Sequence, residues 1–186
     1  HFLRSADVPN EKLLRSIREH FLRNLTQNAM ANYMLKVIGA DSSAKILFLD
    51  ESLPNFPDYL SLFTLSGLKG VFGNRLSVPF EVPYIYEDWD GEAARLYGRG
   101  FSYVRKIPAR YRSRLVTRHN QITTEMLDYH DFIVVGSVER NAHYLPLLKK
   151  NLPNKNVLIN GEDRPNTNLT SSLKEISSYV FVRELP

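Results

Sequence analysis

Three short apolar runs of this 186-residue sequence each end in polar side chains that can bind or react. Asp50 follows the first run, Ser137 the second, and Glu162 and Asp163 the third. Carboxylates in such places can bind hydroxyl groups or a cation, and one of a pair can act as a general base. A serine hydroxyl beside free backbone amides can hold a phosphate group. These residue types point to a ligand that carries hydroxyl or phosphate groups.

The runs that carry these residues have the form of strands buried on both faces. Four or five consecutive apolar residues between polar boundaries are typical of such strands, and helical patterns lie between the runs. This alternation predicts a three-layer α/β domain, Rossmann-like or flavodoxin-like, in which ligands bind outside the carboxyl ends of the strands. We expect four buried, mutually parallel strands, at residues 46–49, 132–135, 157–159 and 180–182.

The chain divides into an N-terminal helical extension, residues 1–40, and an α/β domain, residues 41–186. In the extension, Asn10 can cap a helix whose apolar residues recur every four positions, and a second helix ends at Gly39. In the domain, Asp58 can begin a helix that runs through Phe72. Residues 76–80 are expected to form a short strand, and Pro79 places it at an edge of the sheet or marks its end.

Residues 81–119 show no clear periodicity and contain a strongly basic run. The net charge is +4, yet eight Lys and Arg and no Asp or Glu lie between Arg95 and Arg118, leaving 16 basic and 20 acidic residues elsewhere. The ordinary interpretation is that the run forms an exposed loop that keeps the protein soluble. The more specific interpretation is that the run binds an anionic partner. Tyrosines among the arginines could stack on bases, but nucleic acid ranks third because no nucleic-acid module is recognisable.

Composition excludes several classes of protein. There is no cysteine, which rules out disulfides and thiolate metal sites and suits a reducing, cytoplasmic compartment. No apolar run approaches the roughly 20 residues of a membrane span. The histidines lack metal-ligand spacing, and Gly98–Gly100 does not extend into a dinucleotide fingerprint. We therefore predict no metal, no cofactor and no membrane span.

Each candidate residue also has a plain structural use. Asp50 can fix a turn, Asp58 can cap a helix, and the acids at 162–163 can pair with Arg164. Arg140 and His143 follow Ser137 in one loop, where Arg140 can hold an anion and His143 can act as a base or donor, although a single histidine is more often structural. Both interpretations stay open for these residues.

Several short stretches, taken in order, carry a resemblance to a known group of proteins. They are Ile46–Asp50 with Asp58–Leu60, Gly67–Lys69, Leu96–Phe101, Asp131–Ser137 with Arg140, Asn160–Asp163 and Phe181–Leu185. Together they resemble the N-terminal region of bacterial glycosyltransferase-like proteins, over about residues 45–186. The resemblance implies the first half of a transferase with two facing Rossmann-like domains, in which this half shapes the acceptor side and an absent C-terminal domain holds the nucleotide sugar.

The function expected from these observations is a glycosyltransferase-type domain that contributes to binding a sugar acceptor or a nucleotide sugar, without turnover by this chain alone. The alternative is a non-catalytic, receiver-like α/β module that binds a protein partner. The catalytic base, the donor and the acceptor remain unassigned. The expected binding residues are Asp50, Asp58, Tyr97, Arg99, Ser137, Arg140, Glu162, Asp163 and Arg183.

Overall fold

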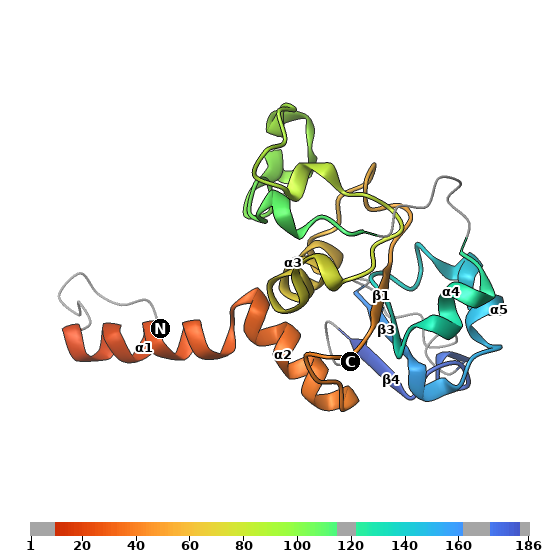
Figure 1. The fold of residues 1–186 in the computed structure, drawn as a ribbon. Coiled ribbons are helices and arrows are strands. Elements are labelled where there is room, and N and C mark those ends of the chain that lie inside the picture. The colour runs from red at the N-terminus through yellow and green to blue at the C-terminus, as the bar shows by residue number, and fades with distance from the viewer. Residues whose placement is uncertain (1–9, 115–121, 162–171, 183–186) are drawn as a thin grey trace.

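The computed structural model describes residues 10–114, 122–161 and 172–182, and it contains one parallel sheet between two layers of helices (Figure 1). The sheet has four strands in the order β1-β2-β3-β4, and every neighbouring pair is parallel. The predicted α/β class and the parallel pairing of the four predicted strands are therefore confirmed. The strands are β1 (Ile46–Leu49), β2 (Phe132–Val135), β3 (Asn156–Asn160) and β4 (Tyr179–Val182).

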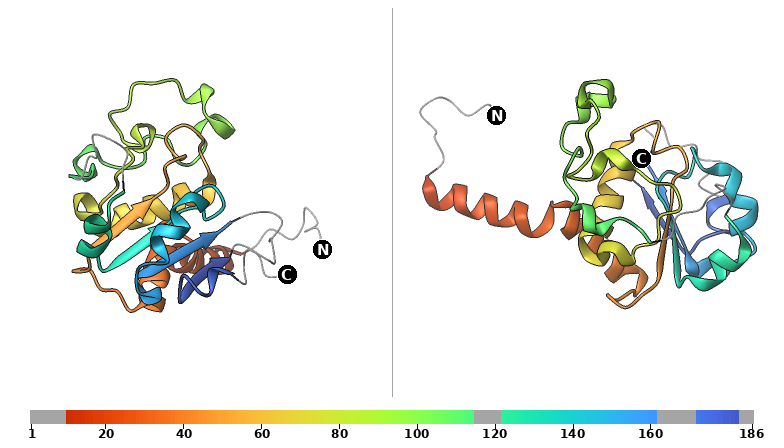
Figure 2. Two further views of the ribbon diagram at one scale, coloured as in Figure 1. Left: turned by 90° about the vertical axis from the view of Figure 1, so that its right-hand side faces the viewer. Right: turned by 45° about the horizontal axis from the view of Figure 1, so that its top comes forward.

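The helices α2, α3, α4 and α5 cover the sheet (Figure 2). The side chains of β1 at Ile46 and Phe48 pack with α2 and α3, whereas those at Leu47 and Leu49 pack with α4 and α5. This separation follows from the strand period of two, which sends alternate side chains to opposite faces. The helices are α1 (Glu11–Asn24), α2 (Gln27–Ile38), α3 (Tyr59–Phe72), α4 (Thr124–Tyr129) and α5 (Leu145–Leu148).

The expected strand at residues 76–80 is reduced to a single bridge on the outer edge of β1. Ser77 donates its N–H to the carbonyl of Ile46 at 3.0 Å and accepts from the N–H of Phe48 at 2.9 Å, in parallel orientation. Pro79, which has no N–H to donate, follows two residues later. Counted in chain order with this bridge as the second member, the sheet runs 2-1-3-4-5, the order of flavodoxin-like folds.

Burial decreases from the centre of the sheet to its far edge. All residues of β1 and β3 are buried, and β2 is buried except at Phe132. The prediction that residues 180–182 form a buried strand is wrong in this respect, because β4 is half-buried to exposed. It pairs only with β3 among the described strands, so one of its sides has no strand to cover it. An apolar run by itself cannot distinguish an edge strand from a central one.

The N-terminal helices differ in how they relate to this core. The side chain of Asn10 accepts from the N–H of Leu13 and caps α1 as predicted, and Gly39 ends α2 in the left-handed conformation at φ 72°. α2 packs closely on α3, where a Cβ on Gly67 would overlap the carbonyl oxygen of Gln27. α1 buries no residue. None of the described helices is both long and apolar enough to cross a membrane.

Residues 81–114 form successive 3-10 turns held by backbone bonds rather than a periodic element. Arg105 and Ile107 donate to the carbonyls of Tyr84 and Ile85, and Glu87 donates to Ile107 at 2.9 Å. The apolar residues show no periodicity because the segment buries single side chains at scattered positions instead of one continuous face. Tyr84 and Tyr103 are nearly inaccessible to solvent, with ring centroids 5.7 Å apart.

A buried lysine joins this segment to the end of α3. Lys69 is 0% exposed, and its ammonium donates to the backbone carbonyl oxygens of Tyr111 at 2.8 Å and Leu76 at 3.4 Å. Burial lowers the pKa of Lys69 from 10.5 to about 8, because removal from water penalises the charged form. The folded protein therefore holds this proton less tightly than the unfolded chain does.

This shift predicts that the free energy of unfolding rises as pH increases from about 8 toward 10.5, where the unfolded chain binds more protons than the folded protein. Between pH 7 and 9.5 the gain from Lys69 should be about 2 kcal/mol. Urea unfolding of the wild-type chain and Lys69→Met at several pH values measures it as the change in their difference. If the two unfolding curves keep a constant separation, Lys69 does not titrate as described.

Candidate functional site

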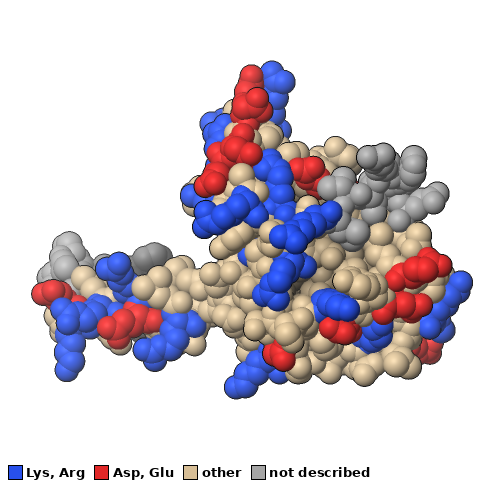
Figure 3. All heavy atoms as spheres, in the orientation of Figure 1, with Lys and Arg blue, Asp and Glu red and all other residues tan. Residues whose placement is uncertain are grey.

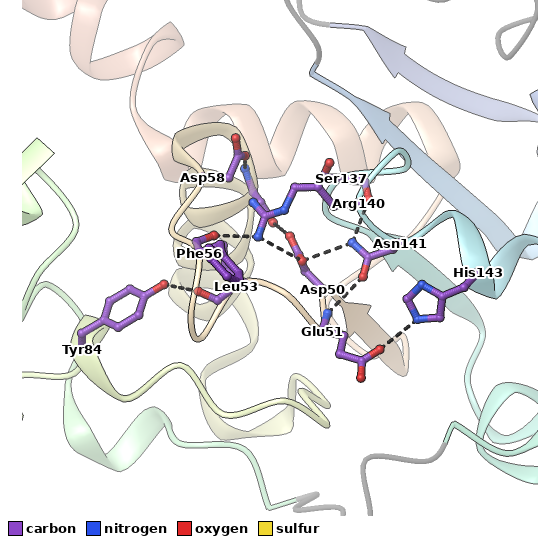
Figure 4. Close-up of polar contacts among 11 residues, drawn as sticks. Asp50, Glu51, Leu53, Phe56, Asp58, Tyr84, Ser137, Arg140, Asn141 and His143 are labelled. Atoms are coloured by element: carbon purple, nitrogen blue, oxygen red, sulfur yellow. Dashed lines mark hydrogen bonds and ion pairs between the residues drawn. The ribbon is translucent and has the colours of Figure 1, made fainter. Parts of the chain in front are cut away.

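Asp50 is the central polar residue at the carboxyl end of the sheet, and its carboxylate is fully enclosed (Figure 4). Oδ2 accepts from the hydroxyl of Ser61 at 2.6 Å, and Oδ1 accepts from the amide of Asn141 at 3.1 Å. The guanidinium of Arg140 lies 3.8 Å from Oδ1. Asp50 thus connects β1, the first turn of α3 and the loop after β2. Its chemistry is to hold these three elements together beneath the site.

Arg140 connects the same centre to the loop that follows β1. Its Nη2 donates to the carbonyl oxygen of Phe56 at 2.6 Å, and its side chain is 22% exposed. A guanidinium has five N–H donors, so these two contacts leave it capacity for a further acceptor. Arg140 is therefore a cation fixed in place at the carboxyl edge and still partly open to solvent.

Glu51, the residue after Asp50, forms a second and more accessible cluster. Its carboxylate Oε2 accepts from Nε2 of His143 and from the hydroxyl of Tyr144, both at 2.8 Å, while its N–H donates to Oδ1 of Asn141 at 3.0 Å. Burial, followed by the hydrogen bond to Glu51, raises the pKa of the Tyr144 hydroxyl, which therefore stays a donor at neutral pH. About half of the His143 side chain is exposed.

This geometry indicates which tautomer the neutral ring of His143 adopts. A carboxylate only accepts hydrogen bonds, so Nε2 of His143 must carry the proton in the bond to Glu51. In the neutral ring the lone pair then lies on Nδ1. The result is an oriented imidazole, reachable by solvent, that can take a proton from a bound hydroxyl group.

Ser137 and Gly136 place the loop after β2 directly against α3. The carbonyl of Ser137 accepts from the side-chain amide of Asn141 at 2.7 Å. A Cβ on Gly136 would overlap the hydroxyl of Ser61 and lie 2.6 Å from the ring of Phe48, so this close approach requires glycine. Asp50 and Ser137 therefore meet at the same edge, where the strand order reverses direction.

The turn formed by residues 97–101 reaches the first turn of α3 from the other side. The ring of Tyr97 contacts that of Tyr59 edge-on, with centroids 5.5 Å apart, and the backbone of Gly98 lies against the Tyr59 hydroxyl. Arg99 has a left-handed φ of 54°, an uncommon conformation for a residue with a Cβ. Tyr97 is 65% exposed, and Phe101 is 76% exposed. This turn presents two rings and an arginine next to α3.

The structure thus brings six of the nine predicted binding residues to the surroundings of the α3 N-terminus. Asp58 caps that helix by accepting from the N–H of Ser61 at 2.8 Å, which is the structural role weighed for it. Gly161, after β3, approaches Leu60 in the same turn. Glu162, Asp163 and Arg183 lie outside the described residues. The six are Asp50, Asp58, Tyr97, Arg99, Ser137 and Arg140.

Several members of the site were absent from the predicted set. Glu51 had a signal, because it directly follows Asp50, and His143 lies in the loop of Arg140. No sequence signal pointed to Asn141, because asparagine is common in loops. In the structure it forms hydrogen bonds with both Asp50 and Glu51. Another feature invisible in the sequence is Asn160, only 5% exposed, whose Oδ1 accepts no hydrogen bond from any described residue.

Within the described part of the chain, three of the eight basic residues of the run form ion pairs or hydrogen bonds inside their own segment. Arg112 pairs with Glu81 at 3.1 Å and Asp88 at 3.0 Å, and Arg95 pairs with Glu92 at 2.7 Å. Arg105 donates to two backbone carbonyls and lies over the ring of Trp89. Figure 3 accordingly shows red and blue side chains mixed on the projecting part of the chain. These pairings favour the ordinary interpretation for Arg95, Arg105 and Arg112, and Arg99 is not among them.

Together, these features define a class: a three-layer α/β domain with flavodoxin-like strand order and a polar site at its switch point. Among the described residues, no three His, Asp or Glu side chains gather closely enough to hold a metal ion. Comparison of the chain with models of protein families, with curated proteins and with solved structures finds no match. The assignment of function therefore rests on the site and on the short stretches of sequence resemblance described above.

Proposed function

We propose that this chain is a glycosyltransferase-type domain that binds a sugar acceptor or a nucleotide sugar at the switch point of its sheet. The observation that carries the proposal is the oriented pair of Glu51 and His143, in which His143 lies in the same loop as the partly open Arg140. Transfer of a sugar to a hydroxyl group requires a proton acceptor, and phosphate groups on a donor require fixed cations. The resemblance of residues 45–186 to glycosyltransferase-like proteins supports the same assignment.

In this proposal each accessible group has a defined role. Nδ1 of His143 takes the proton of the acceptor hydroxyl, and Glu51 stabilises the imidazolium that forms. Arg140 and Arg99 offset the charge of a diphosphate, and the exposed ring of Tyr97 packs on a sugar or base. Asp50 positions Arg140 and Asn141 and does not touch the ligand. A second domain, expected from the resemblance, supplies the remaining donor contacts, so that this chain binds ligand weakly and does not turn it over.

Titration of the chain with nucleoside diphosphates at low and high salt tests this proposal. We expect weak binding that weakens further with salt, because exposed charges are screened beyond about 8 Å at physiological ionic strength. Arg99→Ala and Arg140→Lys should each weaken binding roughly tenfold, the effect of losing one charge-assisted hydrogen bond. Arg15→Ala on α1 is the matched control and should bind as the wild-type chain does.

Two results would each contradict a part of this proposal. Sugar transfer at a steady rate by the isolated chain would exclude the half-enzyme interpretation. No binding of any nucleotide, with both arginine variants behaving as wild type, would favour the receiver-like alternative. The 2-1-3-4-5 order supports that alternative, since flavodoxin-like signalling domains share it. Against phosphorylation as its mechanism, the acid at the end of β1 is enclosed by Ser61, Asn141 and Arg140.

A further inference from the structure

Helix α1 stands apart from the rest of the molecule. Figures 1 and 2 show it extending away from the sheet and its covering helices, and every residue from Glu11 to Asn24 is exposed. An isolated helix of 14 residues is marginal in water, because nucleation is costly and most helical stability comes from packing of an apolar face. The observed conformation therefore calls for something to pack against.

The surface that α1 exposes is an apolar stripe. Its large apolar residues recur at spacings of three and four, which places them along one side of the helix. Each is between 49% and 57% exposed, and further exposed apolar side chains continue onto α2 at Met30, Tyr33 and Val37. A contiguous exposed stripe of this kind marks an interaction surface. Its residues on and directly after α1 are Leu13, Leu14, Ile17, Phe21, Leu22 and Leu25.

The charges on α1 indicate what covers the stripe. A helix that lies on an anionic membrane carries mainly Lys and Arg on its polar face. α1 carries four Lys and Arg, but its polar face also holds two carboxylates, Glu11 in the first turn and Glu19 farther along, and Arg23 lies in the last turn. When two such helices lie antiparallel, the Glu11 end of one meets the Arg23 end of the other, and the helix dipoles also oppose favourably. The charge pattern is thus complementary to a second copy of itself in reverse orientation.

We propose that the chain forms a two-fold symmetric dimer through antiparallel pairing of α1 with α1 of a second copy. Such an interface is isologous: the same stripe is buried on both chains. A helix of 14 residues is about 21 Å long, enough for the apolar side chains of two stripes to interdigitate. The dimer does not depend on the ligand site, because α1 contributes no residue to that site.

Sedimentation equilibrium of the full 186-residue chain tests the proposal. We expect a species of twice the 21.5 kDa chain mass, retained at high salt because apolar burial provides most of the association. Ile17→Glu with Phe21→Glu should raise the dimer dissociation constant roughly a hundredfold or more, as expected when central apolar contacts are lost. The matched control is Ser16→Glu with His20→Glu. It introduces two glutamates at the same spacing of four, but beside the apolar stripe instead of within it, so this variant should still dimerise.

Charge reversal tests the antiparallel orientation separately. Glu11→Arg and Arg23→Glu should each weaken the dimer, and the two together should restore it, because the reversed ends again face opposite charges. In a parallel dimer like residues would meet, and the double variant would show no such restoration. None of these positions is buried, so the variants should keep the melting temperature of the α/β body.

Three outcomes would contradict the dimer. A chain that stays monomeric across the concentration range has no self-association through α1. Equal dimerisation by the two double-Glu variants would place the contact elsewhere. A monomer that sediments with anionic phosphatidylserine vesicles at low salt, and is released at high salt, would assign the stripe to a membrane surface instead.

Discussion

Replacing Asp50 with Ala should lower the free energy of unfolding by about 3–5 kcal/mol, the range for removing one partner of a buried charged network. The loss is large because Asp50 accepts from Ser61 and Asn141 and faces the guanidinium of Arg140. Without the carboxylate, these donors remain enclosed with fewer acceptors, and the loops at the carboxyl edge lose their common anchor. Chemical denaturation followed by circular dichroism measures the change.

Asp58→Ala is the matched control for Asp50→Ala. It removes the same side chain eight positions away, but only the cap of α3 is lost, which should cost about 1 kcal/mol. Asp50→Asn should fall between the two, because the amide keeps one oxygen but brings an N–H pair toward Ser61 and Arg140. If Asp50→Ala costs no more than Asp58→Ala, the enclosed network does not stabilise the fold.

Gly67→Leu should destabilise the fold by about 3 kcal/mol or more, at or above the upper end of overpacking costs. A Cβ at this position already overlaps the carbonyl oxygen of Gln27 and lies 2.9 Å from Cβ of Ala31, so a larger side chain must push α2 off α3. Because the clash is with the backbone of Gln27, a change of side-chain rotamer cannot relieve it. The loss of stability would appear as a lower melting temperature. Displacement of α2 from α3 would appear as faster amide hydrogen exchange at Ala31, Met34 and Leu35.

Gly70→Leu provides the comparison within the same helix. The three atoms nearest to its Cβ would all belong to the side-chain amide of Asn28, which is exposed and can turn away. Both substitutions gain the helix propensity that glycine lacks, so the difference between them isolates the approach of α2 to α3. Equal stability of the two variants would show that α2 does not dock on α3 as described.

Secondary structure was largely predictable from local signals. Short apolar runs identified β1, β2, β3 and β4 because strands in a parallel sheet need apolar residues on both faces. Asn10, Asp58 and Gly39 marked helix ends because capping depends on residues only a few positions apart. The parallel pairing followed from helices between strands. In each case the physical cause operates within one element or between consecutive ones.

What the sequence alone determined about this protein was therefore a parallel α/β sheet with polar groups at the carboxyl ends of its strands. Only the tertiary structure decided what those groups do. It enclosed Asp50, exposed the neighbouring Glu51 and joined it to His143, 92 positions away. It also placed Ser77 outside β1, β4 at an edge and α1 in solvent. Such outcomes depend on contacts between segments that are distant in the sequence, and local residue patterns do not specify which of these segments will contact each other.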